Sequence, residues 1–217
     1  MHLIRQGAEA KLFRTTHDGE PALLKQRVEK DYRCTELDER LRRERTAIEA
    51  NMLRKARQLG IETPQVFSVD RQKKEILMQF IDGPRVKDIL NKQNLRLCSE
   101  IGKAVAIMHA AGLIHGDLTT SNIMLAEGKR PCREATFPKA FCDAKRLFFI
   151  DFGLSFNSGK LEDRAVDLLV FKKTFEATHC ALMPLGWEKI MEGYLGAGGN
   201  KDVVKQMQKV TERARYS

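Results

Sequence analysis

Two short acidic segments in the second half of the chain limit its fold and chemistry more than any other feature. The first, HGDLTTSN, covers residues 115–122, and the second, FFIDFG, covers residues 148–153. Asn122 follows Asp117 by five residues, and Asp151 comes directly after an apolar run. Either segment alone is compatible with an ordinary turn, because Asp, Asn and Gly are favoured in turns. Together, one after a predicted helix and one after a predicted strand, they indicate two loops that meet at one site.

The residue types in these loops are those that transfer of a phosphoryl group from a nucleotide requires. In that reaction an aspartate accepts the proton of the attacking hydroxyl, and an asparagine five residues later holds a magnesium ion. Asp117 is therefore predicted to be catalytic, and Asn122 and Asp151 to bind Mg²⁺. Magnesium takes oxygen ligands and needs few from the protein, because phosphates and water complete its octahedron. ATP is the predicted nucleotide.

A lysine near the N-terminus completes this set. Lys25 ends the apolar run ALLK, and it is predicted to reach the α- and β-phosphates of ATP as a catalytic point charge. Such a lysine needs an acidic partner, for which the long helix offers Glu44 and Glu49. Glu49 is preferred because its neighbours place it beside the inward face of that helix. An edge-strand lysine whose stem covers apolar surface is the alternative for Lys25 alone.

Two further segments are predicted to contact the nucleotide. Their residues are Gly7, Ala8, Glu9, Ala10, Met78, Gln79, Phe80 and Ile81. The first four form a turn with one glycine, and its small residues permit close approach of the backbone to phosphate. The last four would supply a residue lining the adenine pocket, Met78, and the hinge backbone after it. As a lone feature, a methionine such as Met78 is more often simply a core residue.

The pattern of elements predicts an α+β chain with a minimal two-lobed, protein-kinase-like fold. Residues 1–82 form a β-rich N-lobe with one long helix, and residues 83–217 form a reduced helical C-lobe. The two lobes together make one domain. The break between them is expected at residues 82–84, an Asp-Gly-Pro sequence, since Gly and Pro interrupt regular structure.

Alternating apolar runs and turns predict three antiparallel strands within the first thirty residues, followed by strands at 66–69 and 76–80. A helix is expected from Thr35 to Leu59, with a capping box of Thr35 and Asp38 and an apolar stripe. That stripe comprises Ile48, Met52, Ala56 and Leu59. Residues 126–145 are expected to form a surface loop between two strands.

Further helices are predicted from about Leu97 to Gly112, from Asp163 to His179 and from Asn200 to Arg215. Asp163 is expected to cap the second of these helices. Asp167, one turn further on, is expected to be a buried acceptor for the backbone of the catalytic loop.

Composition adds a bias in binding partners. Lysine and arginine number 38 against 29 acidic residues, a net charge of +9 that attracts polyanions such as nucleic acid or ATP. The run from Arg40 to Arg45 is either a basic patch or a solvated helix face. No stretch approaches the roughly eighteen apolar residues of a membrane span, so no membrane association is expected. Five scattered cysteines without metal-ligand spacing indicate reduced thiols, and hence a cytoplasmic or nuclear protein.

Several parts of a peptide-phosphorylating enzyme are missing. Only nine residues separate Gly153 from Asp163, and no Ala-Pro-Glu motif follows them. Gly116 stands where an arginine would precede the catalytic aspartate, and Thr119 where a lysine would follow it. ATP hydrolysis, autophosphorylation or transfer within a complex therefore fits better than phosphorylation of free peptides.

The segments QGAEA, KDYR, HGDLTTSN, IDFGLS and EDxxVDL resemble the small atypical kinase/ATPase subunit of the KEOPS (EKC) complex over nearly the whole chain. The resemblance implies a two-lobed kinase fold and an ATPase that supports an associated transferase in forming threonylcarbamoyladenosine on tRNA, with some serine/threonine kinase activity. It implies a transferase subunit on the C-lobe, a small regulatory subunit on the N-lobe, and contact with tRNA that is indirect or uses the basic surface.

By position, the resemblance implies that Lys25 and Glu49 form an ion pair, that Asp117 is a base or orients water, and that Asn122 and Asp151 bind magnesium. A dense basic tail usual in that family is not evident in residues 211–217. The alternatives are a small-molecule kinase of the aminoglycoside phosphotransferase type and a nucleotide-binding scaffold without turnover. Few residues follow Asp151, which disfavours the former, and the intact site residues disfavour the latter.

Overall fold

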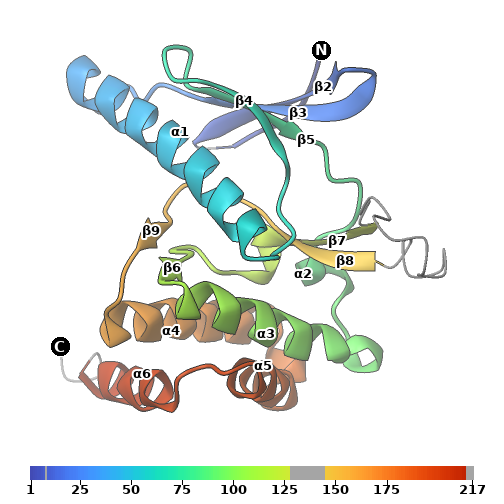
Figure 1. Cartoon of the computed structure of the whole chain (residues 1–217), viewed down its shortest axis with the longest axis vertical. Helices are drawn as coiled ribbons and strands as arrows, with labels where there is room; N and C mark the ends of the chain where they lie inside the picture. The colour runs from blue at the N-terminus through green and yellow to red at the C-terminus, as the bar shows by residue number, and fades with distance from the viewer. Residues whose placement is uncertain (8, 128–144, 214–217) are drawn as a thin grey trace.

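The computed structural model describes residues 1–7, 9–127 and 145–213, apart from the side chain of Glu212. A five-stranded antiparallel sheet with the order β1-β2-β3-β5-β4 forms one end of the molecule, and helices form the other (Figure 1). The strands are β1 (His2–Gln6), β2 (Ala10–His17), β3 (Glu20–Arg27), β4 (Val66–Asp70) and β5 (Glu75–Gln79). The predicted strands are confirmed, and β3 lies in the centre of the sheet.

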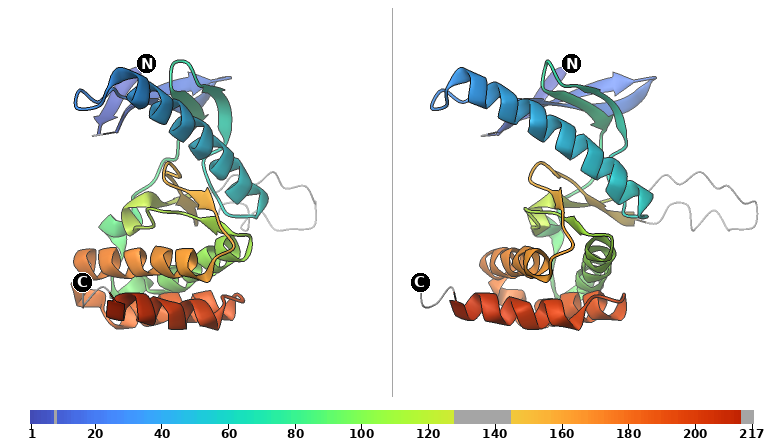
Figure 2. Two further views of the ribbon diagram at one scale, coloured as in Figure 1. Left: turned by 90° about the vertical axis from the view of Figure 1, so that its left-hand side faces the viewer. Right: turned by 60° about the vertical axis from the view of Figure 1, so that its left-hand side comes forward.

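The long helix α1 (Thr35–Gln58) runs from the sheet towards the helical end of the molecule (Figure 2). The predicted capping box is wrong: Cys34 is the N-cap, and no side chain caps the helix. The carboxylate of Asp38 instead accepts a hydrogen bond from Arg42 Nε at 2.5 Å. The predicted stripe is partly wrong, because Ile48 is 39% exposed and Glu49 lies on the buried face.

In the part of the chain that the structure describes, the helical end contains four long helices and several short elements. The long helices are α3 (Arg96–Ala110), α4 (Leu161–Thr178), α5 (Leu185–Gly196) and α6 (Lys201–Arg213). Among the described residues, the short elements are α2 (Val86–Ile89), η1 (Lys92–Asn94), η2 (Thr120–Asn122), η4 (Cys180–Leu182), β6 (Leu113–Ile114), β7 (Ile123–Glu127), β8 (Lys145–Phe149) and β9 (Phe156–Asn157). The four long helices lie below the paired strands β7 and β8 in Figure 1. Most of the predicted loop at 126–145 lies outside the described residues.

Helix α5 is not among the predicted helices. Its sequence contains Gly186, Gly193 and Gly196, and glycine is a poor helix former. Two of these glycines allow close packing: a Cβ on Gly193 would lie 2.0 Å from the backbone oxygen of Ser99 in α3. The low helix propensity of α5 is thus the consequence of a packing requirement.

Two more details of the helical end bear on the predictions. Asp163 does not cap α4, whose N-cap is Lys160; its carboxylate accepts a hydrogen bond from Ser158 Oγ at 2.5 Å. Helix α4 otherwise begins within two residues of the predicted start. Within the described residues, no helix is both long and apolar enough to cross a membrane.

One apolar core connects the two ends of the molecule. It runs from Leu53 on α1 through Val105 on α3 to Phe171 on α4 and Tyr194 on α5. The chain connecting β5 to α2 packs closely on β7, because a Cβ on Gly83 would lie 2.3 Å from the backbone oxygen of Leu125. This packing fixes how the sheet stands over the loops that carry the acidic residues.

Candidate active site

A buried lysine lies between two carboxylates at the centre of the molecule. Lys25 Nζ on β3 is 2.6 Å from Glu49 Oε1 on α1 and 2.8 Å from Asp151 Oδ1, after β8. The side chain of Glu49 is 1% exposed, whereas Glu44 is exposed on the same helix. The structure therefore brings together Lys25 and the glutamate preferred from the sequence.

These charges stabilise one another, with Lys25 and Glu49 buried and the side chain of Asp151 49% exposed. Burial alone would lower the pKa of Lys25, but Glu49 and then Asp151 raise it above its ordinary value. Burial would raise the pKa of Asp151, but the charge of Lys25 and its hydrogen bond hold that pKa below the ordinary value. Both groups are therefore ionised at neutral pH.

Asp117 and Asn122, the two residues of the predicted catalytic loop, contact each other directly. Asn122 Nδ2 donates to the backbone oxygen and to the carboxylate Oδ2 of Asp117, both at 2.9 Å. The loop between them turns through η2, where the Thr119 side chain accepts a hydrogen bond from Ser121 N at 3.2 Å. The amide of Asn122 thus fixes the orientation of the Asp117 carboxylate.

The pairing of β7 with β8 brings the two predicted magnesium ligands to one place. Ile123 pairs with Phe149, and Ile150 N donates to the backbone oxygen of Asn122 at 2.9 Å. Asn122 directly precedes β7 and Asp151 lies two residues after β8, so both stand at the same end of this hairpin. A carboxylate and an amide oxygen fit Mg²⁺, which takes oxygen ligands and shares them with phosphates.

The expected role of Asp167 is confirmed. Its carboxylate accepts hydrogen bonds from the backbone N–H groups of His115 at 3.2 Å and Gly116 at 2.9 Å. His109 Nε2 lies 3.2 Å from the same carboxylate, and Tyr194 lies 3.2 Å from the other nitrogen of that ring. Burial would raise the pKa of Asp167, but its bond to His109 helps to keep that pKa below the ordinary value.

Gly116 has a conformational reason to stand where an arginine would otherwise precede the aspartate. Its φ is +79°, and a Cβ there would lie 2.3 Å from the backbone oxygen of Leu154. A side chain at this position would therefore force apart the two loops that carry Asp117 and Asp151.

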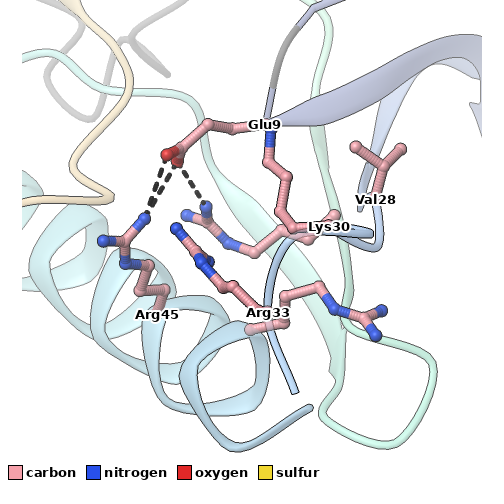
Figure 3. A pocket seen from close by; sticks show the side chains of 7 residues that line it. Glu9, Val28, Lys30, Arg33 and Arg45 are labelled. Atoms are coloured by element: carbon pink, nitrogen blue, oxygen red, sulfur yellow. Dashed lines mark hydrogen bonds and ion pairs between the residues drawn. The ribbon is translucent and has the colours of Figure 1, made fainter. Parts of the chain in front are cut away.

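The predicted phosphate turn is tied to the rest of the sheet and to α1. Gly7 N donates to Ala10 O at 2.9 Å, and the carboxylate of Glu9 lies 3.0 and 3.2 Å from Arg45 Nη1 (Figure 3). Glu9 Oε2 also lies 3.5 Å from Arg27 Nη1. Ala8 lies outside the described residues. Ion pairs therefore fix a turn that has few glycines.

Of the residues predicted to contact adenine, Met78 and Gln79 end β5, and Phe80 and Ile81 directly follow it. Met78 is 4% exposed and belongs to the main core, while Ile81 packs with Phe148 in a smaller apolar cluster. Gln79 N donates to Gln65 O at 2.8 Å, and Phe80 N to Pro21 O at 3.3 Å. Contact of these four residues with adenine stays a prediction.

Arg27 is a residue of this site that the sequence-based prediction missed. It lies two residues after Lys25, so both side chains point to the same face of β3. Arg27 Nη2 donates to Glu49 Oε2 at 2.5 Å. The two-residue spacing of cations on a central strand was the signal available in the sequence.

The burial of His115 predicts a stability that depends on pH. The ring packs on Phe152 with centroids 4.6 Å apart, and burial lowers the pKa of His115 below its ordinary value of about 6.5. Because the folded state then binds fewer protons than the unfolded state, stability falls as pH decreases below about 6.5.

We expect His115→Asn, which keeps an acceptor for Asp117 N–H, to lose less thermal stability between pH 7.5 and pH 5.5 than the wild type. Scanning calorimetry at both pH values, with exposed His2→Asn as control, tests this; equal losses for His115→Asn and wild type would contradict it.

A lysine on a central strand that pairs with a helix glutamate, above an Asp–Asn loop and an Asp-Phe-Gly turn, defines a protein-kinase-like fold. The RIO domain family model matches residues 7–132. The chain is 36% identical over 229 residues to the KEOPS complex subunit Bud32 of Pyrococcus abyssi, covering 100% of this chain and 96% of the relative. The chain therefore belongs to the RIO domain family and, within it, to the family of Bud32.

Longer relatives and solved structures agree with this assignment. The chain is 37% identical over 215 residues to a Methanococcus maripaludis protein named "Probable bifunctional tRNA threonylcarbamoyladenosine biosynthesis protein", covering 99% of this chain but 36% of the relative. The fold matches the Rio2 kinase–ADP/Mg²⁺–phosphoaspartate complex of Chaetomium thermophilum, with a TM-score of 0.65, 16% identity and coverage of 98% of this chain and 70% of that chain. Membership of this family favours an ATPase and kinase of the KEOPS type over an aminoglycoside-type kinase.

Proposed function

We propose that this protein is an ATP- and Mg²⁺-dependent phosphotransferase and ATPase that supports the formation of threonylcarbamoyladenosine on tRNA. One observation carries the proposal: a buried ion pair of Lys25 and Glu49 is joined by the partly exposed carboxylate of Asp151, beside the hydrogen-bonded pair of Asp117 and Asn122. Similarity over the full chain to a KEOPS subunit supports the biological setting.

In this proposal each site residue has one chemical task. Lys25 keeps its bond to Glu49 and turns from Asp151 to the phosphates of ATP. Asp151 and Asn122 hold Mg²⁺, which when bound neutralises charge on the phosphates. Asp117 accepts the proton of the attacking hydroxyl or water, and Asp167 holds its loop in place through the backbone.

The acceptor and the setting of the reaction are narrower parts of the proposal. Serine and threonine hydroxyls are the proposed protein acceptors, and hydrolysis or transfer within a complex is proposed as the main reaction. Residues 1–82 and 83–217 are proposed as two lobes that enclose the nucleotide, with a regulatory subunit on the first and a transferase subunit on the second. Contact with tRNA is proposed to be indirect or through the basic surface, in the cytoplasm or nucleus.

Reconstitution tests the proposed function. The chain is mixed with the transferase subunit of the complex, ATP, Mg²⁺, tRNA and an activated threonylcarbamoyl donor prepared beforehand, and modified adenosine is measured by mass spectrometry. We expect repeated rounds of modification only when the chain is present, and loss of this stimulation with Asp151→Ala. Modification that proceeds equally well without the chain would contradict the role in tRNA modification. ATP turnover stimulated by an aminoglycoside would support the small-molecule alternative.

A further inference from the structure

Arg27 is a buried cation in the site to which the functions above assign no task. Its side chain is 4% exposed, although it extends from the strand that ends near the surface turn of Glu9. Nη2 donates to Glu49 Oε2 at 2.5 Å, while Lys25 occupies Oε1 of the same carboxylate at 2.6 Å. Both oxygens of Glu49 are thus paired with cations.

The same guanidinium lies against the Asp-Phe-Gly turn. A Cβ on Gly153 would lie 2.6 Å from Arg27 Nη2, 3.3 Å from Asp151 Oδ1 and 3.5 Å from Glu49 Oε2. Through Glu9, at 3.5 Å from Nη1, the side chain also reaches the predicted phosphate turn. Arg27 therefore joins β3, α1, the turn at Glu9 and the loop that holds Asp151.

Charge balance gives this arrangement a chemical consequence. The charges of Lys25, Arg27, Glu49 and Asp151 sum to zero, so the cluster does not repel the anionic phosphates of a nucleotide. Without Arg27 the cluster would carry a net negative charge, and buried Glu49 would depend on Lys25 alone. Charges in a poorly solvated site interact strongly, so Lys25 would then be held more firmly by its carboxylates.

We propose that Arg27 is a positioning residue for nucleotide binding: it holds and neutralises Glu49, so that Lys25 is released to the phosphates. Its ion pair with Glu9 links the phosphate turn to Glu49 through the same guanidinium. The inference rests on the proposed function, because it concerns the ATP site.

Helix α1 offers a matched control for a purely structural ion pair. Arg42 Nε donates to Asp38 Oδ2 at 2.5 Å, and the Asp38 side chain is 1% exposed, as is that of Glu49. Arg42 also lies 3.2 Å from Glu29 on the surface. This pair has the chemistry of the Arg27–Glu49 pair and involves neither Lys25 nor Glu9. A difference between the two arginines in nucleotide affinity would therefore not come from stability alone.

The experiment compares Arg27→Gln, Arg27→Lys and Arg42→Gln with the wild type, using the dissociation constant for ADP with Mg²⁺ from isothermal titration calorimetry and stability from urea unfolding. We expect Arg27→Gln to weaken affinity about tenfold, which is about 1.4 kcal/mol. Arg27→Lys keeps the charge and is expected to recover most of the affinity. Arg42→Gln is expected to lower stability with no change in affinity.

Equal affinities of Arg27→Gln and wild type, or equal losses for both arginine variants, would overturn the inference alone. Failure of the wild type to bind ADP with Mg²⁺ would overturn the proposed function as well. If Arg27→Gln does not fold, the link between Arg27 and the phosphate turn is tested with Glu9→Gln, which removes the exposed partner of Arg27. The dissociation constant for ADP with Mg²⁺ of this variant is compared with that of a Glu29→Gln control, which removes the exposed partner of Arg42. A Glu9→Gln dissociation constant at least about threefold above the control supports the link, and a smaller change overturns it.

Discussion

Asp117→Asn is expected to lower ATP turnover by about 10²- to 10⁴-fold, the range found for loss of a general base. The amide cannot accept a proton, yet it has the same shape, and its oxygen can still accept the hydrogen bond that Asn122 Nδ2 donates at 2.9 Å. Folding should therefore be preserved. Steady-state release of phosphate from ATP, measured with purified protein at saturating Mg²⁺, gives the turnover number directly.

Two controls make this result specific. Asp202→Asn changes an exposed carboxylate on α6, which accepts a hydrogen bond from Lys205 Nζ at 3.0 Å, and should leave turnover unchanged. Circular dichroism and the affinity for ADP should be the same in Asp117→Asn and the wild type. Turnover that survives the Asp117 substitution would show that another group activates the acceptor, or that the activity comes from a contaminant.

Gly102→Ala is expected to destabilise the fold by about 3 kcal/mol, at the upper end of the usual cost of overpacking a core. A Cβ on Gly102 would lie 1.9 Å from the backbone oxygen of Ile190 and 2.8 Å from Tyr194 N, so α3 and α5 would have to separate. Helix propensity alone predicts the opposite sign, since alanine stabilises a helix by about 1 kcal/mol relative to glycine. The free energy of unfolding in urea decides between these two expectations.

Gly196→Ala is the matched substitution for this comparison. It lies at the end of α5, and a Cβ there would meet no atom within 4 Å. We expect it to be neutral or to stabilise the fold by up to about 1 kcal/mol. Gly102→Ala with a stability equal to that of the wild type would mean that the two helices adjust their crossing without cost.

Local patterns predicted the elements that form the site, but two capping predictions failed because each aspartate bonds to another nearby side chain. The strands, α1 and the Asp–Asn loop follow from residue type and short spacing. The capping box at Thr35 failed because Asp38 has a stronger partner in Arg42. The same holds for Asp163, whose carboxylate bonds to Ser158 and does not cap α4.

The sequence by itself determined which residues have the chemistry of phosphoryl transfer: Lys25, Asp117, Asn122 and Asp151 stand in recognisable short motifs. The sequence also favoured Glu49 over Glu44 as the partner of Lys25, and the structure confirms that pair. The further bond of Lys25 to Asp151, which is 126 residues away in the chain, was left to the tertiary structure. Short motifs record residue type and local spacing, whereas pairing across such separations depends on how the sheet, α1 and the β7–β8 hairpin pack.

The roles of Arg27 and of the glycines of α3 and α5 were likewise decided only by the tertiary structure. An arginine on a strand gains a role only when a glutamate of α1 and a glycine of another loop lie beside it. A glycine in a helix lowers local propensity, and only the approach of a neighbouring backbone to 1.9 Å from the position of its missing Cβ makes it necessary. Contacts of this kind arise from packing and leave no periodic signal in the sequence.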